Sequence, residues 1–472
     1  MRRSRSHGAK VSVTVRFLTS VLLNSDSSIL EDTIMKILRV IQLTLLAHHL
    51  CGTETFAFPP DIFDDRHLYT FDECEETLDL SGKGLTKFDR NFISDGTCLE
   101  NLSLRNNNIQ EFQEGIFSDL TDLEYLDLSW NKLSPTTMFS FGSVPSLKTL
   151  ILEENKRKNI FHDILFSFDT KFHFPELTRL SLVATGITHI EINWSEYFPK
   201  IEELDVSENY LVSVDDFLKN LPPTLRSLKM RVMGLTKLRI QNLNNLRSLK
   251  LDGNNFHSIK RSNCDEDSLC LENLDGLEYL SAFLCDIHSI TPDAFEHMTK
   301  LAHLDIGVNK ITQISKGTFG YSPSLSYLDI NVNPLVDISF LGELKNLTTL
   351  HMNGIEDSQA MKSLWSLSSL RMVQDLSLGA NEISSIPRRF LDNLQDLREL
   401  RLFDNRISFL SPGSWQKNLK VIDLSNNLIT KIEDLHLSEA TSLELLDLRG
   451  NELLTIEPQV KKTLPENVDL KL

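Results

Sequence analysis

Apolar and polar positions follow one repeated arrangement from Leu78 to Ile456. Leucine or isoleucine recurs at the first, fourth, sixth and eleventh positions of a unit, and asparagine recurs at the ninth. One unit that carries the whole pattern is Leu123-x-x-Leu126-x-Leu128-x-x-Asn131-x-Leu133. Side chains two residues apart point the same way in an extended chain, so the fourth and sixth positions predict a short strand with one apolar face.

The arrangement returns every 24 residues over most of its length. We count 16 units, whose first positions are Glu75, Leu99, Leu123, Leu147, Leu177, Ile201, Leu225, Leu246, Leu277, Leu301, Leu325, Leu347, Val373, Leu397, Leu419 and Leu443. A single unit cannot bury its apolar side chains, whereas stacked units share a continuous core. The sequence therefore predicts an α/β solenoid of about 16 units, with a concave parallel β-sheet and a mostly irregular convex side.

Two further recurring residue types fit this solenoid. Asparagine occupies the ninth position in 11 of the 16 units, and Cys285 takes that position in another. An amide both donates and accepts hydrogen bonds, so we expect these asparagines to pair with backbone groups inside sharp turns, and Cys285 to be a buried thiol. Aromatic residues recur near the nineteenth position and should pack on the convex side: Phe117, Phe141, Phe295, Phe319 and Trp415.

These motifs resemble the leucine-rich repeat family over most of the chain. The phenylalanine-bearing 24-residue unit looks like the type found in Toll-like receptor ectodomains, Slit and other extracellular members. The resemblance implies a horseshoe and a non-enzymatic role in protein recognition, without a cofactor. Because the chain stops soon after its last unit, it is more similar to short secreted members, including insect leucine-rich immune proteins, than to a complete receptor.

The first 57 residues do not carry the repeat. From Met35, two basic residues precede the apolar run 40–47, and small and polar residues follow. This layout is typical of a secretory signal peptide, and the run is shorter than the roughly 20 residues that span a bilayer. A buried first helix is the alternative. We assign residues 1–57 to a signal-peptide region, with Met35 rather than Met1 as the expected start, and expect a secreted, extracellular product without stable membrane insertion.

The rest of the chain divides into three parts. We expect residues 58–98 to form an N-terminal cap and the first repeat, 99–456 the leucine-rich repeats, and 457–472 a capping tail. The alternating apolar end of the tail, Val468-x-Leu470-x-Leu472, suits a segment that covers the last unit. If the tail does not cover the last unit, its exposed edge can pair with another chain, so a homo- or hetero-oligomer is possible.

Four cysteines predict two disulfides. Cys74 and Cys98 each lie four residues before the first strand leucine of adjacent units, so they share a column of strands about 4.8 Å apart, a separation that a disulfide fits. Cys264 and Cys270 lie in an inserted stretch, 260–272, and we expect a local disulfide to close it. The short acidic loop Asn263-Cys264-Asp265-Glu266-Asp267 could instead bind calcium, but its oxygen positions do not match an EF-hand loop.

Three Asn-x-Ser/Thr sequences become glycosylation sites in a secreted chain. They begin at Asn101, Asn193 and Asn346. Asn101 is expected on the outward side of a strand, where a glycan would obstruct the first units of the concave face and move ligand contact further along.

A candidate partner-binding patch lies on the concave face of units nine to eleven. Its residues are apolar or aromatic where serine and aspartate are expected: Tyr279, Phe283, Leu284, His303, Val308, Tyr327 and Val332. Basic residues precede them, namely Lys229, Arg231 and Lys250, after the acidic Glu203, Asp205 and Glu208. Such banding suits a folded protein partner better than a uniform polymer. The alternative is that scattered exposed apolar groups are normal.

Composition and motifs exclude several classes of function. With 48 Lys and Arg against 66 Asp and Glu, the formal charge is −18, which argues against nucleic-acid and anionic-membrane binding. No nucleophile elbow, phosphate-binding glycine loop or His-Glu-x-x-His motif occurs. His303 and His351, two units apart on the concave side, could form a metal pair, but solvated or pH-sensitive surface groups are the commoner case.

Two functional hypotheses follow. The first is a secreted, non-enzymatic module that recognises an extracellular protein partner on its concave face, in innate immunity or cell-surface interaction. The second is a structural or adhesive component of the extracellular matrix, like the small leucine-rich proteoglycans. A recognition protein should saturate one partner through the patch from Tyr279 to Val332, whereas a matrix protein should bind repeating polymer or collagen.

Overall fold

The computed structural model describes most of the repeat region. The described residues are 76–89, 98–155, 165–166, 172–240, 243–355, 358–367, 369–453, 464–465 and 467–472, all within the unit Pro60–Leu472. The predicted signal-peptide region 1–57, with Met35, lies outside the described residues, as does Cys74. Among the described residues no helix is long and apolar enough to cross a membrane.

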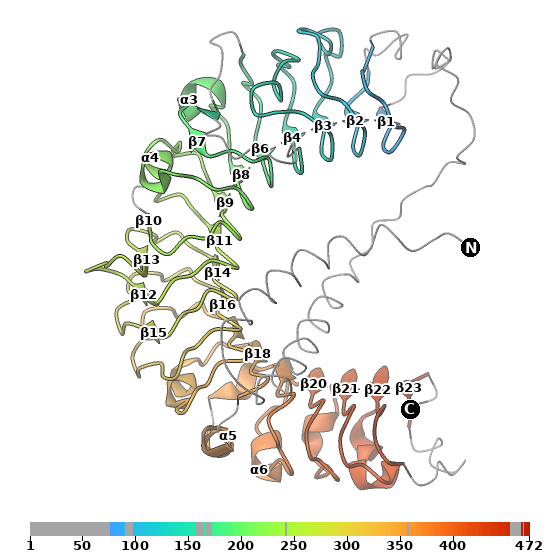
Figure 1. Ribbon diagram of the computed structural model, residues 1–472. Helices are drawn as coiled ribbons and strands as arrows, with labels where there is room; N and C mark the ends of the chain where they lie inside the picture. The colour runs from blue at the N-terminus through green and yellow to red at the C-terminus, as the bar shows by residue number, and fades with distance from the viewer. Residues whose placement is uncertain are drawn as a thin grey trace, which may run out of the picture. The chain divides into compact units, whose positions relative to one another are not determined.

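Short parallel strands form along one side of the repeats, at the predicted leucine positions (Figure 1). The strands of this inner sheet are β1 (Thr77–Asp79), β2 (Asn101–Ser103), β3 (Tyr125–Asp127), β4 (Thr149–Ile151), β6 (Arg179–Ser181), β8 (Glu203–Asp205), β9 (Ser227–Lys229), β11 (Ser248–Lys250), β14 (Tyr279–Ser281), β16 (His303–Asp305), β17 (Tyr327–Asp329), β18 (Thr349–His351), β19 (Asp375–Ser377), β20 (Glu399–Arg401), β21 (Val421–Asp423), β22 (Leu445–Asp447) and β23 (Asp469–Lys471). The predicted repeat solenoid with a parallel inner sheet is confirmed.

The register of the inner sheet places equivalent residues of successive repeats side by side. Leu126 in β3 lies opposite Leu102 in β2 and Leu150 in β4, and all three are fully buried. The residues on either side of each central leucine point to the other face. Every strand therefore gives one side chain to the core and two to the inner surface, which positions the candidate site.

The recurring asparagines satisfy backbone groups inside the turns, as predicted. Asn131 donates from Nδ2 to the carbonyls of Leu104 and Leu128, at 2.9 and 3.0 Å, and its Oδ1 accepts from the Ile109 N–H at 3.1 Å. Cys285 is a free, buried thiol that donates to the Leu251 carbonyl at 3.2 Å. These bonds link each turn to the one before it, so the stack keeps its buried backbone groups paired.

The outer side of the repeats mixes short elements with irregular chain. Its helices are α3 (Trp194–Tyr197), α4 (Val214–Lys219), α5 (Ser358–Leu364) and α6 (Arg388–Leu391), with 3₁₀ turns η2 (Ser339–Glu343), η3 (Leu370–Met372), η4 (Ser414–Gln416), η5 (Ile432–Leu435) and η6 (Leu437–Glu439). The predicted aromatic residues are buried there, and the rings of Phe295 and Phe319 stack with centroids 5.5 Å apart.

The outer side also carries strands. β5 (Leu165–Phe166) pairs with β7 (His189–Ile190), and a four-stranded parallel sheet has the order β10 (Leu238–Ile240), β13 (Ser268–Leu271), β12 (Ser258–Lys260), β15 (Ser289–Ile290). The inserted stretch 260–272, expected as a loop, supplies β13, which enters between β10 and β12. Its side chains from Ser268 to Leu271 are buried, which explains why the insertion is held against the repeats.

The chain end adds a strand to the last predicted repeat. Leu470 in β23 lies opposite Leu446 in β22. Val468 and Leu470 pack half-buried against the core, whereas Leu472 is 51% exposed. Two of the three alternating apolar residues of the tail therefore contact the core, and the assignment of residues 457–472 to a capping tail stays a prediction.

Candidate functional site

The inner sheet aligns side chains in two columns across β9 to β20. The first strand residues form one column: Ser227, Ser248, Tyr279, His303, Tyr327, Thr349, Asp375 and Glu399. The third strand residues form the other: Lys229, Lys250, Ser281, Asp305, Asp329, His351, Ser377 and Arg401. Neighbours in a column lie one strand spacing apart, about 4.8 Å. The character of the inner surface is therefore set by which residues occupy the columns.

Three rings of the first column form a continuous stack, which we call the ring stack: Tyr279, His303 and Tyr327. The Tyr279 and His303 centroids are 4.1 Å apart with planes 13° from parallel, and those of His303 and Tyr327 are 3.8 Å apart at 9°. The strand spacing matches the thickness of stacked rings. Because each ring covers its neighbour's face, the stack offers ring edges, hydroxyls and imidazole nitrogens to a partner. Burial, with nearby carboxylates, raises the pKa of Tyr279 to about 12, so the hydroxyl stays protonated at neutral pH.

A basic cluster borders the ring stack. It consists of Lys229, Arg231 and Lys250 on and after β9 and β11, and Asp205 in β8 lies against it. The Asp205 Oδ2 is 3.8 Å from Lys229 Nζ and 3.5 Å from Arg231 Nη2. Lys250 Nζ lies 4.7 Å from the centroid of the Tyr279 ring, within the range of a cation–π contact. The cluster and the ring stack therefore form one continuous surface.

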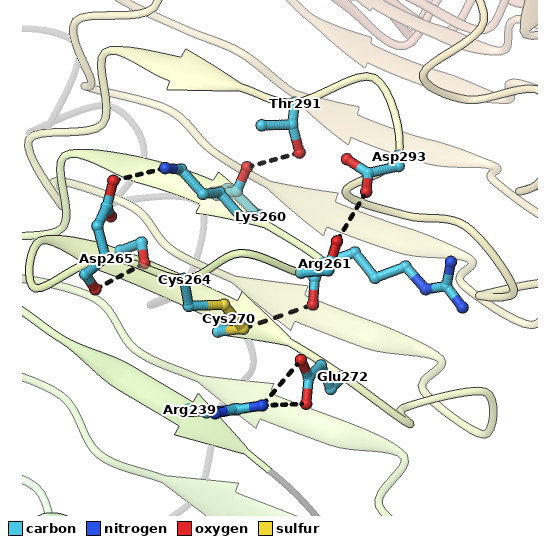
Figure 2. Close-up of a disulfide and its surroundings, with 12 residues drawn as sticks. Arg239, Lys260, Arg261, Cys264, Asp265, Cys270, Glu272, Thr291 and Asp293 are labelled. Carbon is cyan, nitrogen blue, oxygen red and sulfur yellow. Dashed lines mark hydrogen bonds and ion pairs between the residues drawn. A yellow bond between two sulfur atoms is a disulfide. The ribbon is translucent and has the colours of Figure 1, made fainter.

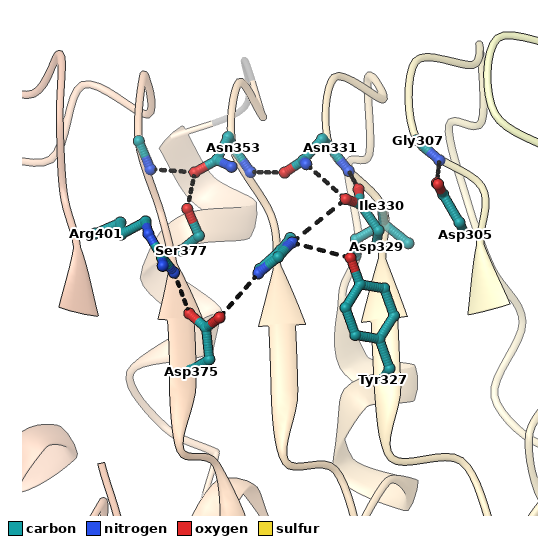
Figure 3. A network of polar contacts seen from close by, with 12 residues as sticks. Asp305, Gly307, Tyr327, Asp329, Ile330, Asn331, Asn353, Asp375, Ser377 and Arg401 are labelled. Carbon is teal, nitrogen blue, oxygen red and sulfur yellow. Dashed lines mark hydrogen bonds and ion pairs between the residues drawn. The ribbon is translucent and has the colours of Figure 1, made fainter. Parts of the chain in front are cut away.

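An acid–histidine network follows on the other side of the ring stack (Figure 3). His351 lies between two carboxylates, with Nδ1 3.4 Å from Asp329 Oδ2 and Nε2 3.4 Å from Asp375 Oδ2. Arg401 Nη1 binds the other oxygen of Asp375 at 2.5 Å. The Tyr327 hydroxyl lies 3.3 Å from His351 Nδ1, which joins the network to the ring stack.

Burial and close charges shift the pKa values in this network. Burial lowers the pKa of His351, but hydrogen bonds to Asp329 and Asp375 outweigh it and raise the value to about 9. Burial raises the pKa of Asp375, yet hydrogen bonds from His351 and Arg401 bring it below the ordinary value. Burial, together with the charge of Asp329, raises the pKa of Asp305 well above its usual range. With this pKa His351 is protonated at neutral pH, and His351 and Arg401 are the cations of the network.

Among the described residues, neither histidine belongs to a group placed to hold a metal ion. His303 lies in the first column and His351 in the second, and each makes its own contacts. The side chain of His351 is only 18% exposed, so it is not the solvated group that was expected. Its aspartate partners were not singled out from the sequence, although the strand register places Asp329 beside His351 in the second column and Asp375 in the first column of the next strand.

The apolar residues of the predicted patch follow the strands. Val308 is buried, with 9% exposure, so its expected place on the exposed surface is wrong. Phe283, Leu284 and Val332 are half-buried. Leu284, Val308 and Val332 have positive φ angles of 54°, 53° and 50°, a region that branched residues rarely adopt. They stand directly before the ninth position of the repeat, where residues of other repeats, such as Asn106 and Trp130, also have positive φ angles. The turn therefore sets this backbone whatever the side chain.

The predicted glycosylation sites lie at three separate places. Asn193 and Asn346 are exposed. Asn101 is half-buried in β2, and its Nδ2 contacts the Glu76 carbonyl at 3.5 Å and Thr77 Oγ1 at 3.3 Å. A glycan on Asn101 would replace these two contacts at the beginning of the inner face. The other two asparagines also donate from Nδ2, Asn193 to Glu196 Oε2 at 3.3 Å and Asn346 to the Pro323 carbonyl at 2.8 Å.

The inserted stretch holds a disulfide between Cys264 and Cys270, whose Cα atoms are 5.9 Å apart (Figure 2). Nearby acidic residues bind basic side chains: Asp265 contacts Lys260 at 2.6 Å and Glu272 contacts Arg239 at 3.0 Å. Of the acidic loop 263–267 that the calcium alternative requires, Asp265 is therefore paired, and Glu266 also contacts a basic side chain, Lys237, at 2.8 Å.

The first predicted pair is described only in part. Cys98 is disulfide-bonded. Its expected partner, Cys74, lies outside the described residues, so this pairing stays a prediction.

Comparison with known proteins identifies the repeats. The family model described as "Leucine rich repeat" matches residues 76–133, 284–335 and 405–453. Leucine-rich repeat-containing G-protein coupled receptor 5 of Rattus norvegicus is 31% identical over 137 residues, covering 29% of this chain and 15% of the receptor. Podocan-like protein 1 of Homo sapiens is 26% identical over 200 residues, covering 41% of this chain and 38% of that protein. The chain thus spans less than half of these relatives.

A solved structure matches over most of the chain. The crystal structure of the TLR13–ssRNA13 complex aligns with a TM-score of 0.55 at 19% identity, covering 81% of this chain and 59% of the other. At this identity the likeness concerns the fold alone. Leucine-rich repeat folds are recognition scaffolds, and such proteins mediate protein–protein recognition.

Proposed function

Because the chain is a leucine-rich repeat protein, we propose that it is a secreted, non-enzymatic recognition module for an extracellular protein. The binding surface is the inner face of β9 to β17, formed by the basic cluster and the ring stack. The observation that carries this proposal is the continuity of the two, with Lys250 Nζ 4.7 Å from the centroid of the Tyr279 ring. Aromatic and cationic side chains on a rigid sheet are the residue types that dominate protein interfaces.

The arrangement of charge favours a folded protein over a uniform polymer. Basic side chains occupy only two neighbouring strands of this region, after Asp205 in β8 and before Asp305 in β16. A uniform polymer presents the same group at every step and gains from a continuous stripe of one charge. A folded protein matches a basic band, an aromatic band and an acidic band with different residues, so banding gives specificity.

Secretion is supported by the disulfide between Cys264 and Cys270, because structural disulfides persist in oxidising compartments. The signal-peptide layout of residues 1–57 and the three glycosylation sequences point the same way. We place the recognition role in innate immunity or at the cell surface, where the extracellular repeat proteins that the chain resembles act.

The proposal is tested with the full chain recovered from culture medium and used as bait for extracellular proteins. Replacing Tyr279, Phe283 and Tyr327 together by serine should remove a partner that the wild type retains. Tyr321→Ser, which removes a ring that is 52% exposed outside the inner strands, is the matched control and should keep the partner. Urea unfolding of each variant shows whether the stack survives.

Three results would contradict the proposal. The chain is absent from the medium, or the triple variant binds its partner at full strength, or the bound material is collagen or another repeating polymer irrespective of the triple substitution. The last result supports a matrix component instead.

A further inference from the structure

The basic cluster has more positive charge than its neighbours neutralise. Lys229 and Arg231 share one oxygen of Asp205, at 3.8 and 3.5 Å, distances longer than an ordinary charge-assisted hydrogen bond. Asp252, the next carboxylate, is engaged by the Ser281 hydroxyl and by the Phe283 N–H at 3.2 Å. Three cations therefore face one loosely held carboxylate, and a second that already accepts two hydrogen bonds.

Two further observations show that the cluster lacks an anion. The Nε of Arg231 is buried and has no hydrogen-bond partner among the described residues, although a buried guanidinium nitrogen without a partner is costly. Burial, together with the charges of Lys229 and Arg231, lowers the pKa of Lys250 below its ordinary value. An added carboxylate would offset the repulsion among the three cations and would meet the accessible part of the Arg231 side chain, which is 42% exposed.

The surroundings limit the size of the anion. Arg226 and Arg247 stand just before β9 and β11, but each has its own carboxylate, Glu202 at 3.3 Å and Glu278 at 2.8 Å. In the column that carries Lys229 and Lys250, the next residues are Ser281 and Asp305. Uncompensated positive charge is therefore confined to β9 and β11 and the residues next to them. This extent suits one acidic group, and it is too short to bind a polyanion along its length.

We propose that Lys229, Arg231 and Lys250 form a subsite for a single carboxylate, supplied by an aspartate or glutamate side chain of the protein partner. This inference rests on the proposed function, and it names the chemistry that the partner must present at one end of the ring stack. The residues that flank the acidic side chain lie over Tyr279, one strand away, where hydroxyl and ring edges accept polar or aromatic neighbours.

The test uses a defined probe on the purified full chain. The pentapeptide acetyl-Gly-Tyr-Glu-Tyr-Gly-amide is titrated at low salt by ligand-observed NMR, next to the peptide with glutamine in place of glutamate. We expect the glutamate peptide to bind at least tenfold more tightly, since charge-assisted hydrogen bonds are lost in the glutamine peptide. Equal binding of the two peptides would overturn the subsite.

Paired variants locate the effect. Lys229→Gln with Arg231→Gln should weaken the glutamate peptide at least tenfold. Arg226→Gln with Arg247→Gln removes the same number of positive charges just before β9 and β11 and should change binding less than twofold. If both pairs of substitutions weaken the peptide equally, the peptide responds only to the overall positive charge of the surface, and the subsite is overturned. Tight binding of heparin that depends on Lys229 and Arg231, without peptide binding, would overturn it in favour of a polyanion.

The same variants separate this inference from the proposed function. A natural partner that is lost with the tyrosine and phenylalanine substitutions, but kept by the Lys229 and Arg231 pair, leaves the recognition role intact and removes the carboxylate subsite. The converse result is also distinct. If the glutamate peptide binds and the Lys229 and Arg231 substitutions weaken it, but the chain retains no extracellular protein, the carboxylate subsite stands and the recognition role does not.

Discussion

The basic cluster and the acid–histidine network occupy equivalent strand positions and use their charges in opposite ways. In the network, His351 lies 3.4 Å from a carboxylate on either side, and Arg401 binds the second oxygen of Asp375. In the cluster, Lys229 and Arg231 share one carboxylate oxygen at longer distances. The backbone is the same in both. Whether a charge is compensated within the sheet or stays free for a partner is therefore decided by the residue one strand away.

Exposure adds to the difference. The side chains of His351 and Asp329 are 18% and 4% exposed, whereas those of Lys229 and Arg231 are 32% and 42% exposed. Ion pairs in a low-dielectric site are costly to break, because the group left behind is buried and uncompensated. Half-exposed charges contribute little to stability. The network should therefore matter for folding and the cluster for binding, and three predictions test that division.

The largest effect is expected from His351→Ala. This change leaves Asp329 without its cation and weakens Asp375, so the free energy of unfolding should fall by about 3–5 kcal/mol. Urea unfolding followed by circular dichroism measures it. Thr349→Ala, on the same strand and the same face, is the control and should cost less than about 1 kcal/mol. If His351→Ala lowers the free energy of unfolding no more than the control does, the network is not the part of the sheet that matters for folding.

The dependence of stability on pH should be nearly as large. The pKa of His351 rises from about 6.5 in the unfolded chain to about 9 in the folded one, so its contribution is complete below pH 6.5 and is lost as the pH rises through 9. The shift corresponds to about 3 kcal/mol. The raised pKa of Asp305 acts in the same direction, because its protonated form also belongs to the folded state.

Urea midpoints at pH 6 and pH 9.5 measure this dependence. The wild type should be less stable at the higher pH, and His351→Gln should lose most of the difference. Stability that rises between these two pH values would show that His351 is not held as a cation.

The smallest effect is expected from Lys250→Met. Burial and the neighbouring positive charges already disfavour the charged form of Lys250, and methionine keeps an apolar stem over the Tyr279 ring. The free energy of unfolding should stay within about 0.5 kcal/mol of the wild type or rise slightly. A loss above about 2 kcal/mol in the same urea assay would mean that Lys250 is a structural residue, and would erase the contrast with His351.

The repeat pattern made most of the fold predictable. Leu126 and Leu128 specify a strand and a core, and Asn131 specifies the turn, because each has one physical task that recurs every unit. The residues from Ser268 to Leu271 were not recognised as a strand. They lie in an insertion without the repeat pattern, and their pairing partners in β10 and β12 belong to the outer side, where the sequence repeats less strictly.

The site was only partly predictable. Tyr279, His303 and Tyr327 could be assigned to one surface, since their register follows from the leucines. That the rings stack on one another depends on side-chain rotamers. The exposure expected of Val308 was wrong, although the equivalent Leu284 and Val332 are half-buried, so the place in the repeat alone does not decide exposure.

The strand β13 separates neighbouring repeats on the outer side more than on the inner side. Three successive repeats place β9, β11 and β14 on the inner side, with two gaps between them, while β10, β13, β12 and β15 make three gaps on the outer side. One additional gap of about 4.8 Å across layers about 10 Å apart splays these repeats by roughly 27°. The splay lies directly behind Lys229, Arg231, Lys250 and Tyr279. We expect this splay to tilt their side chains toward one another, so that an insertion on the outer side shapes the inner surface for a small ligand group.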